Sequence, residues 1–228
     1  MDAKKRNIID LIFNLAIFLS TAVAVGYYFV GGPDILGSRG SGCFKYFTTD
    51  SNVLAALGAL VMLFYNVKKL RAPETATPKW AAIFKFVGAV SVTITFLTVV
   101  LFLVPVSCAK GGLRSFFFYF EGNVFALHFS TPVLAALSVM FFERDAALTE
   151  RDALWALAPT VVYSIVYAVM VIYVGKWTDW YGFTFGGHSR LAPVSMVGMY
   201  LVTYGVAAAE RRIRAGKAGK PCDAADIA

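Results

Sequence analysis

Two residues with the chemistry of a nucleophile and a base lie at the same predicted membrane depth. Thr48 opens a run of polar residues that ends at Asn52, directly before an apolar stretch. His128 follows the start of another apolar segment, at Val124, by about one helical turn, or roughly 6 Å. A threonine hydroxyl attacks a carbonyl once a base takes its proton, and histidine is the most common base. The pair therefore indicates nucleophilic catalysis with Thr48 as nucleophile and His128 as general base. Helix capping by Thr48 and a simply packed histidine are the alternatives.

Further side chains at the same outer ends are candidates to assist this chemistry. Helical spacing puts Asn52 on the face of Thr48, so its amide and the backbone N–H groups of the first turn are candidate oxyanion donors. Thr49 adjoins Thr48, and either hydroxyl could face the cavity. Trp180 and Tyr181 belong to an aromatic loop of the kind that marks membrane interfaces, where they could hold a substrate.

No metal or other cofactor is expected. The two histidines, His128 and His188, and the outer carboxylates Asp50, Glu121 and Asp179 show no metal-ligand spacing. His188 lies in a glycine-rich loop, which makes it a poor substitute for His128 as the base.

The composition places these residues in a bilayer rather than in a water-soluble domain. Hydrophobic residues make up 58% of the 228 residues and charged residues 15%, against roughly 25% charged in ordinary soluble domains. A membrane-spanning helix needs about 20 mostly apolar residues, and β-barrel strands would be half as long with alternating polarity. The sequence therefore predicts an all-α integral membrane protein, a bundle of six transmembrane helices. Their approximate ranges are Ile8 to Val30, Thr48 to Val67, Trp80 to Val104, Val124 to Phe142, Trp155 to Val174 and Ala192 to Ala209.

The distribution of basic residues predicts that both termini are cytoplasmic. With the N-terminus inside, the inner segments hold 14 Lys and Arg and the outer loops hold 6, as the positive-inside rule requires. The net charge of +7 is then mainly an orientation signal, and no nucleic-acid partner is expected. Residues 1–209 form one predicted transmembrane domain, and 210–228 form a predicted flexible, basic cytoplasmic tail. A cleavable signal peptide ending near Ala24 is the alternative for the first segment, although Asp10 and Asn14 interrupt its apolar run.

Few ionisable residues fall inside the predicted helices. Asp10 and Lys85 lie within two turns of predicted cytoplasmic ends, so we expect them to snorkel or to cap a helix at the interface. No Asp, Glu, Lys or Arg is predicted near the midpoint of a helix, where a proton-coupled carrier would need one.

Three cysteines leave one possible disulfide. Cys43 and Cys108 fall in predicted outer loops, whereas Cys222 falls in the cytoplasmic tail. Cys43 and Cys108 are therefore the only pair in an oxidising compartment. A bridge between them would tie the segment before Thr48 to the loop before His128; two free thiols are the alternative.

Three short blocks resemble the androgen-induced and androgen-dependent membrane protein family and its bacterial relatives. The blocks are Phe44-Lys45-Tyr46-Phe47-Thr48-Thr49-Asp50-Ser51-Asn52, Leu127-His128-Phe129-Ser130-Thr131-Pro132 and Trp180-Tyr181-Gly182-Phe183. The resemblance implies a threonine hydrolase that cleaves fatty acid esters of hydroxy fatty acids within the membrane. It matches the family threonine to Thr48 and the family histidine to His128. Gly182 stands where the third block usually has Pro, and Pro132 follows the histidine at a spacing more like the bacterial branch.

Two function classes therefore compete. The first is an intramembrane lipid ester hydrolase whose partner is a membrane lipid or fatty acid ester. The second is a non-catalytic lipid-binding or transport protein, which requires a polar path past the membrane midplane. A short chain without long loops or an Asn-x-Ser/Thr site favours a multi-pass protein of a bacterial plasma membrane.

Topology is directly testable with reporter fusions. Fusions placed after Lys69 and after Arg214 should both read as cytoplasmic, because the basic residues gather on that side. An external signal from either fusion would reject the predicted orientation.

Overall fold

The computed structural model describes residues 2–31 and 38–216, and six of its helical stretches are long and apolar enough to cross a bilayer. They occur in the predicted order, so the expectation of a helical chain with six candidate spans is confirmed. The stretches are Ala3–Val30, Phe47–Arg71, Lys79–Gly111, Gly122–Phe142, Glu150–Tyr173 and Ser189–Gly216.

The helices within these stretches are mostly interrupted. The first two are the continuous helices α1 (Ala3–Val30) and α2 (Phe47–Arg71), and the last contains α10 (Ala192–Gly216) after a short 3-10 turn, η6 (Ser189–Leu191). The third combines α3 (Lys79–Thr98), the π-helical turn η2 (Val99–Leu103) and α4 (Val104–Gly111). The fourth combines α6 (Gly122–Phe125), the π-turn η3 (Ala126–Ser130), α7 (Thr131–Leu137) and the π-turn η4 (Ser138–Phe142). The fifth combines α8 (Glu150–Trp155), α9 (Leu157–Ala168) and the π-turn η5 (Val169–Tyr173). A 3-10 helix, η1 (Gly40–Lys45), precedes α2, and α5 (Arg114–Phe118) follows α4.

Helix α10 corrects the predicted boundary of the C-terminal tail. It continues past Ala209 to Gly216, so Glu210 to Gly216 belong to the helix rather than to a flexible tail. The reason is packing: Glu210 is buried and accepts a hydrogen bond from Thr93 Oγ1 at 2.7 Å, and Arg214 donates to the carbonyl of Ala146 at 2.8 Å. Residues 217–228 of the predicted tail lie outside the described residues.

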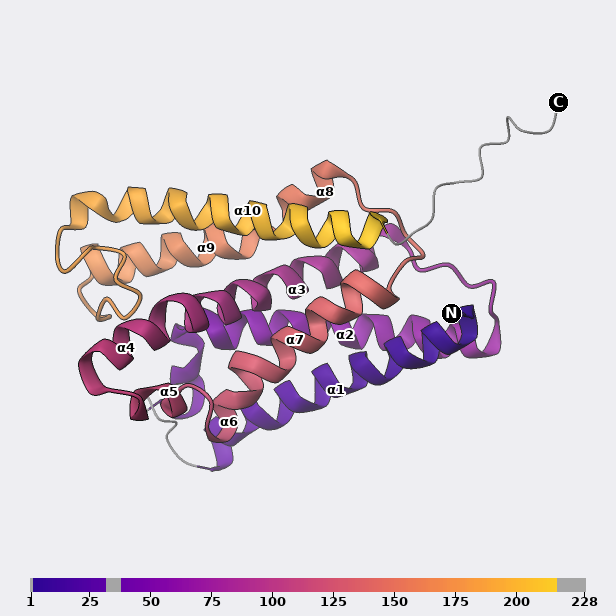
Figure 1. Cartoon of the computed structure of the whole chain (residues 1–228), viewed down its shortest axis with the longest axis horizontal. Helices are drawn as coiled ribbons and strands as arrows, with labels where there is room; N and C mark the ends of the chain where they lie inside the picture. The colour runs from indigo at the N-terminus through magenta and orange to yellow at the C-terminus, as the bar shows by residue number, and fades with distance from the viewer. Residues whose placement is uncertain (1, 32–37, 217–228) are drawn as a thin grey trace.

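Two groups of helices form the bundle. Helix α2 lies between α1 and α3, and α7 packs on α1 and α3. Helices α9 and α10 pair with each other, and α10 also packs on α3 (Figure 1). The start of α1 and the end of α10 lie at one end of the bundle, which we call the terminal end. The opposite end, with η1, α5 and residues 174–188, is called the loop end.

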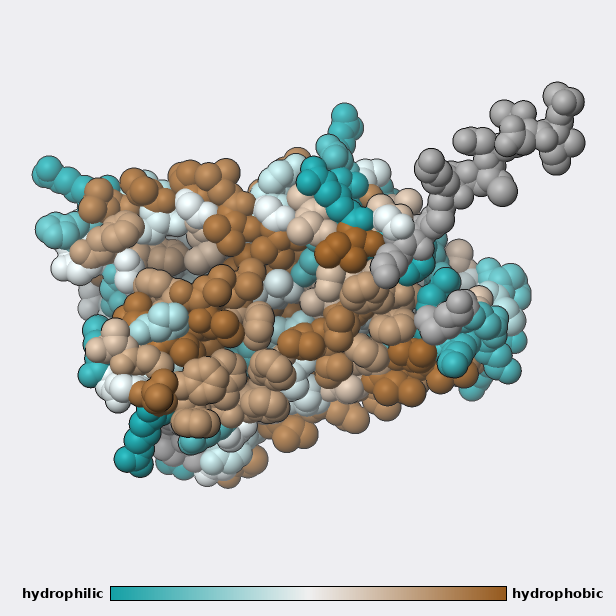
Figure 2. Space-filling model, viewed as in Figure 1, coloured by the Kyte–Doolittle hydropathy of each residue, from teal (hydrophilic) through white to brown (hydrophobic). Residues whose placement is uncertain are grey.

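Side chains on the bundle surface follow the pattern of a membrane protein. In Figure 2 apolar residues cover most of the middle of the visible face, and hydrophilic residues gather toward both ends. Many large apolar side chains are exposed, among them Val23, Leu101, Val162 and Leu201. Such a surface suits lipid, because exposed apolar area on this scale is rare on soluble proteins.

Two prolines coincide with π-turns. Pro105 and Pro132 stand in the first turn of α4 and α7, each directly after a π-turn. Proline has no N–H to donate to the carbonyl four residues earlier and its ring crowds that carbonyl, so an α-helix cannot continue through it undisturbed. For Pro132 that carbonyl belongs to His128. The local disturbance therefore falls on the turn that carries the predicted base.

Small residues let α2 and α3 approach at backbone distance. A methyl group added at Gly88 would lie 2.8 Å from the Cα of Ala55, and one added at Gly58 would lie 3.0 Å from the Cα of Lys85. Close contacts between small residues are a common way for helices to associate in lipid, where the hydrophobic effect does not drive helices together. This contact fixes the height and rotation of α2 relative to α3.

The α2–α3 contact predicts opposite effects for two glycine substitutions. Gly88→Ala should destabilise the protein by about 1–3 kcal/mol, because the added methyl meets backbone rather than a flexible side chain. Gly205→Ala, in α10, should be neutral or stabilising by up to about 1 kcal/mol, since nothing lies within 4 Å of its added methyl. Thermal unfolding in detergent measures both, and equal melting temperatures would contradict the contact.

Candidate active site

Thr48 lies in the first turn of α2, at the loop end. The helix begins at Phe47, and the carbonyl of Lys45 just before it accepts a hydrogen bond from the hydroxyl of Tyr163 at 2.7 Å. Thr48 is half-buried, whereas Thr49 is 1% exposed. The N–H groups of Thr49 and Asp50 donate to the Tyr46 carbonyl at 3.1 and 3.4 Å. The Phe47 N–H is engaged by the phenols of Tyr163 and Tyr181, so the donor left for a ligand in this turn is the N–H of Thr48.

His128 lies in the π-turn η3 with a defined ring orientation. It is 6% exposed, and its Nδ1 lies 2.8 Å from the backbone carbonyl oxygen of Tyr119. A carbonyl only accepts, so Nδ1 carries the hydrogen and the lone pair of the neutral ring is on Nε2. This contact at Nδ1 agrees with the alternative of a packed histidine. The other ring nitrogen, Nε2, carries a lone pair and can therefore accept a proton, as a general base must.

One cavity of about 250 Å³ brings most of the predicted site residues together. Thr48, Thr49, His128, Trp180 and Tyr181 all line it. They come from α2, from η3 and from the loop before η6, which are far apart in sequence. The remaining lining residues are Tyr28, Tyr46, Leu103, Tyr119, Val124 and Thr178. His188 is exposed in its loop and does not line this cavity.

Asn52 does not fit the predicted role of oxyanion donor. Its Nδ2 donates to the Thr48 carbonyl at 2.7 Å and to the Leu127 carbonyl at 2.9 Å, so both amide hydrogens are used. Helical spacing correctly puts Asn52 below Thr48, but the carbonyl of Leu127 across the bundle takes its second hydrogen. Asn52 therefore ties the turn that carries Thr48 to the turn that carries His128.

Tyr181 is a better placed donor beside Thr48. Burial raises the pKa of the Tyr181 phenol to about 12, although hydrogen bonds with Thr48 and Tyr163 oppose the rise. The phenol therefore keeps its proton at neutral pH and can donate it to a ligand oxygen. Trp180 offers a second donor, because its Nε1 is buried without a hydrogen-bond acceptor among the described residues.

A narrow apolar cavity of about 30 Å³ adjoins the other side of Thr48. Thr48, Leu103 and Tyr181 line both cavities. The apolar side chains around the narrow one include Ile94, Val99, Phe183 and Met199. Its volume is about the share of a single water molecule in the liquid. A long chain would enter it only after these side chains move.

Asp179 organises the loop that carries Trp180 and Tyr181. Its carboxylate accepts hydrogen bonds from the hydroxyl of Tyr167, the N–H of Phe183, and both the N–H and the hydroxyl of Thr184, at 2.6 to 2.9 Å. Burial raises the pKa of Asp179, but the hydrogen bonds from Thr184, Tyr167 and Phe183 outweigh burial and hold it below its usual value. Around it, the rings of Tyr167, Trp180 and Tyr181 pack at centroid distances of 5.3 to 6.2 Å.

The suggested disulfide is not formed in the structure. Cys43 is buried in an apolar cluster with Ala24, Tyr28 and Leu127, whereas Cys108 is half-buried near the end of α4. The two cysteines pack in different surroundings. The segment before Thr48 is held instead by Tyr163 on α9 through the Lys45 carbonyl.

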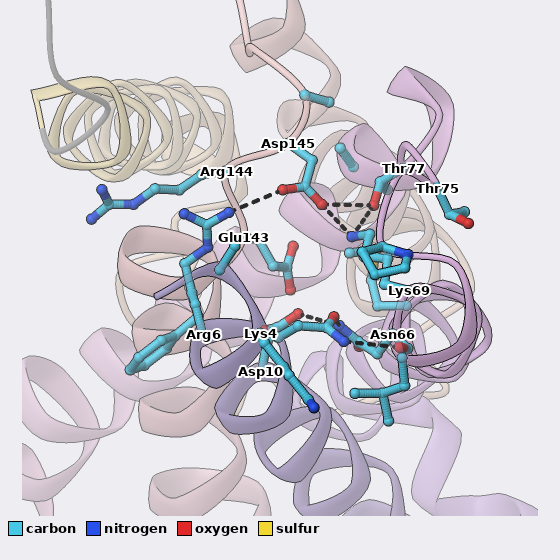
Figure 3. Close-up of a pocket in the computed structure, with 18 of the residues that line it drawn as sticks. Lys4, Arg6, Asp10, Asn66, Lys69, Thr75, Thr77, Glu143, Arg144 and Asp145 are labelled. Atoms are coloured by element: carbon cyan, nitrogen blue, oxygen red, sulfur yellow. Dashed lines mark hydrogen bonds and ion pairs between the residues drawn. The ribbon is translucent and has the colours of Figure 1, made fainter. Parts of the chain in front are cut away.

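The expectation that Asp10 and Lys85 snorkel to the interface is wrong. Lys85 is 0% exposed, donates to Asn14 Oδ1 at 2.6 Å and lies 3.8 Å from Glu143 Oε1. Asp10 is 3% exposed and accepts a hydrogen bond from Asn66 at 2.9 Å. These groups form a buried polar cluster at the terminal end, because their partners come from facing helices rather than from water; Figure 3 shows its members Asp10, Asn66 and Glu143.

Sequence reasoning missed three residues that support the site. The carbonyl of Tyr119 is hydrogen-bonded to His128, and the hydroxyl of Tyr163 is hydrogen-bonded to the backbone just before α2. The carboxylate of Asp179 accepts hydrogen bonds from the aromatic loop. A proline four residues after His128 is a usable signal for a distorted turn at the base. Tyr119 and Tyr163 carry no comparable signal, because each lies in an aromatic, apolar stretch.

Comparison with known proteins adds no assignment: no protein-family model matches the chain, and no curated protein or solved structure does so either. Within residues 2–31 and 38–216, no group of three or more His, Cys, Asp or Glu residues is placed to hold a metal ion.

The loop at Asp179 gives a pH-dependent prediction. Its folded pKa lies below the ordinary 3.8, so the carboxylate stabilises the loop at neutral pH, and this contribution is lost only as the pH falls below about 4. Asp179→Asn should therefore lower the melting temperature at pH 7, and the difference from wild type should narrow as the pH falls below 4. Glu121→Gln, an exposed carboxyl of the same end, is the control and should have no effect. A gap between wild type and Asp179→Asn that persists unchanged at low pH would contradict this role.

Proposed function

We propose that this protein is an intramembrane ester hydrolase that acts on lipid, fatty acyl esters, with Thr48 as nucleophile and His128 as general base. The observation that carries the proposal is the cavity of about 250 Å³ lined by both residues, with the His128 ring fixed by the Tyr119 carbonyl. It agrees with the resemblance of three sequence blocks to the androgen-induced and androgen-dependent membrane protein family. The proposed setting is a bacterial plasma membrane, with both termini cytoplasmic and the cavity toward the outer leaflet.

The proposed reaction has two half-reactions. The Thr48 hydroxyl gives its proton to Nε2 of His128 while its oxygen attacks the ester carbonyl carbon. The oxyanion intermediate then collapses, the alkoxide leaves as an alcohol with the proton from His128, and an acyl-threonine ester remains. Water, deprotonated by the same imidazole, attacks this ester, releases the fatty acid and restores Thr48.

The oxyanion needs donors, and the cavity offers several beside Thr48. The Tyr181 phenol remains protonated at neutral pH and lies next to the Thr48 side chain. The N–H group of Thr48 adds a backbone donor at the positive dipole end of α2. Tyr181 therefore replaces Asn52 in this role. Asn52 is a positioning residue that sets the distance between the two reacting side chains.

Ester hydrolysis by the purified protein in detergent tests the proposal. Thr48→Ala should abolish turnover and labelling by a fluorophosphonate probe, because the nucleophile is lost. His128→Ala should lower the rate by about 10²- to 10⁴-fold, the usual contribution of positioned proton transfer. Thr48→Ser keeps a hydroxyl and should retain measurable activity, and His188→Ala should match wild type because His188 is exposed in its loop. Wild-type rates in folded Thr48→Ala and His128→Ala would reject the mechanism.

The alternative function is non-catalytic lipid binding or transport, and one observation favours it. Polar side chains continue beyond the site toward the terminal end: Ser51 and Thr95 are hydrogen-bonded at 2.8 Å, Thr93 bonds to Glu210, and Lys85 is buried. These polar groups extend further into the bundle than we expected from the sequence, which places no ionisable residue near a helix midpoint. A carrier or binder would treat Thr48→Ala and Thr48→Ser alike in lipid binding or flux, whereas a hydrolase would separate them.

A further inference from the structure

A second sizeable cavity lies at the terminal end, away from Thr48 and His128. It has a volume of about 310 Å³, the lower end of the usual range for small-molecule sites. Side chains from α1, α2, the segment after η4 and the end of α10 line it (Figure 3). The proposed hydrolase chemistry uses none of them.

Positive charge exceeds negative charge in and around this cavity. The cations that line it are Lys4, Arg6, Lys69, Arg144 and Arg214, and Lys85 lies directly behind Glu143. The carboxyl groups that face these cations are Asp10, Glu143 and Asp145. Even with all three ionised, these six cations leave an excess of three positive charges. An excess of this kind at the end of an apolar bundle favours binding of an anion.

Asp145 forms ion pairs with two of the cations. It forms ion pairs with Arg6, at 3.3 Å, and with Lys69, and it accepts a hydrogen bond from Thr77 at 3.4 Å. In Figure 3 the side chains of Arg6 and Lys69 reach Asp145 from different directions. One carboxylate thus faces two positive charges.

The other two carboxyl groups share a single hydrogen. Asp10 Oδ1 and Glu143 Oε1 each lie 2.8 Å from the hydroxyl oxygen of Ser138. A serine hydroxyl has one hydrogen to donate, so it can fully satisfy only one of these two oxygens. The two carboxyl groups face Lys85 and Arg214.

Arg214 supplies the donor that a ligand would meet. It is 4% exposed, and its Nη2 donates to the Ala146 carbonyl at 2.8 Å. Among the described residues its buried Nη1 has no hydrogen-bond partner; it forms only a long ion pair, at 4.0 Å, with Glu143 Oε2, which likewise receives no hydrogen bond. A buried guanidinium nitrogen without an acceptor is costly unless a bound group completes it.

We propose that this cavity binds a phosphate-bearing anion through Arg214, with Lys4 at its rim. A phosphate group suits the site because it carries more than one charge and accepts several hydrogen bonds, which matches an excess of more than one cation. Two sources supply this chemistry: the headgroup of an anionic phospholipid, since hydrophilic residues gather at this end (Figure 2), and a free phosphate. The site is independent of the proposed hydrolysis.

Binding is measured as a shift in melting temperature of the full-length protein in detergent. One arm compares sodium phosphate with sodium chloride at equal ionic strength, which removes general screening. The other arm compares phosphatidylglycerol with phosphatidylcholine added to the micelles. A shift with inorganic phosphate supports a soluble anion, and a shift with phosphatidylglycerol alone supports a lipid headgroup.

Variants assign the shift to this cavity. Arg214→Gln should weaken binding about tenfold or more, the usual effect of losing a charged hydrogen-bond donor. Lys4→Gln is the second variant, because Lys4 is exposed and its replacement leaves the buried cluster intact; it should weaken binding by a smaller factor. Lys68→Gln, exposed at the same end but outside the cavity, should bind like wild type. The proposal is overturned if neither ligand shifts wild type, or if Lys4→Gln and folded Arg214→Gln both bind as tightly as Lys68→Gln.

Discussion

The rest of this bundle depends on how closely α2 lies against α3. Glycines at positions 58 and 88 let the two backbones come nearly into contact, and this fixes α2 in height and rotation. Helix α2 carries Thr48 and Asn52 at the loop end and Asn66 at the terminal end. Both polar regions are therefore set by one apolar, shape-determined contact. In lipid, where apolar burial gives little preference for one partner helix over another, such a contact is a strong determinant of geometry.

A second constraint follows from the lack of water in the apolar interior. Polar groups there must find partners on facing helices or remain costly. The amide nitrogen of Asn52 satisfies this by bonding to carbonyls of α2 and η3, and Lys85 does so by bonding to Asn14 and facing Glu143. The bonds to the Leu127 carbonyl and to Asn14 cross between helices, so they also fix positions. The same physics that makes polar groups rare in this bundle gives each of them a structural role.

The sequence predicted the helical architecture and the placement of Thr48 and His128 at the same end of the bundle, because both follow from apolar length and from counting turns along one helix. It failed where the partner lies on another helix. Asn52 has the predicted position, but the Leu127 carbonyl uses its amide. Lys85 is near a helix end, as expected, yet Asn14 and Glu143 hold it inside. The end of α10 was missed for the same reason, because Thr93 and the Ala146 carbonyl make Glu210 and Arg214 part of the bundle.

The π-turn at His128 has a consequence for the whole fourth span. A π-turn holds one residue more than the α-helical turn it replaces, and one residue corresponds to about 100° of rotation about the helix axis. The turn thus resets the angular phase of α7 and η4 relative to α6. His128 faces the loop-end cavity while Ser138 reaches Asp10 on α1. Deleting one residue within Ala126–Ser130 would rotate one half of the span against the other, so the two ends could no longer both be in register with their neighbours. A single extra residue lets one helix serve both ends of the bundle.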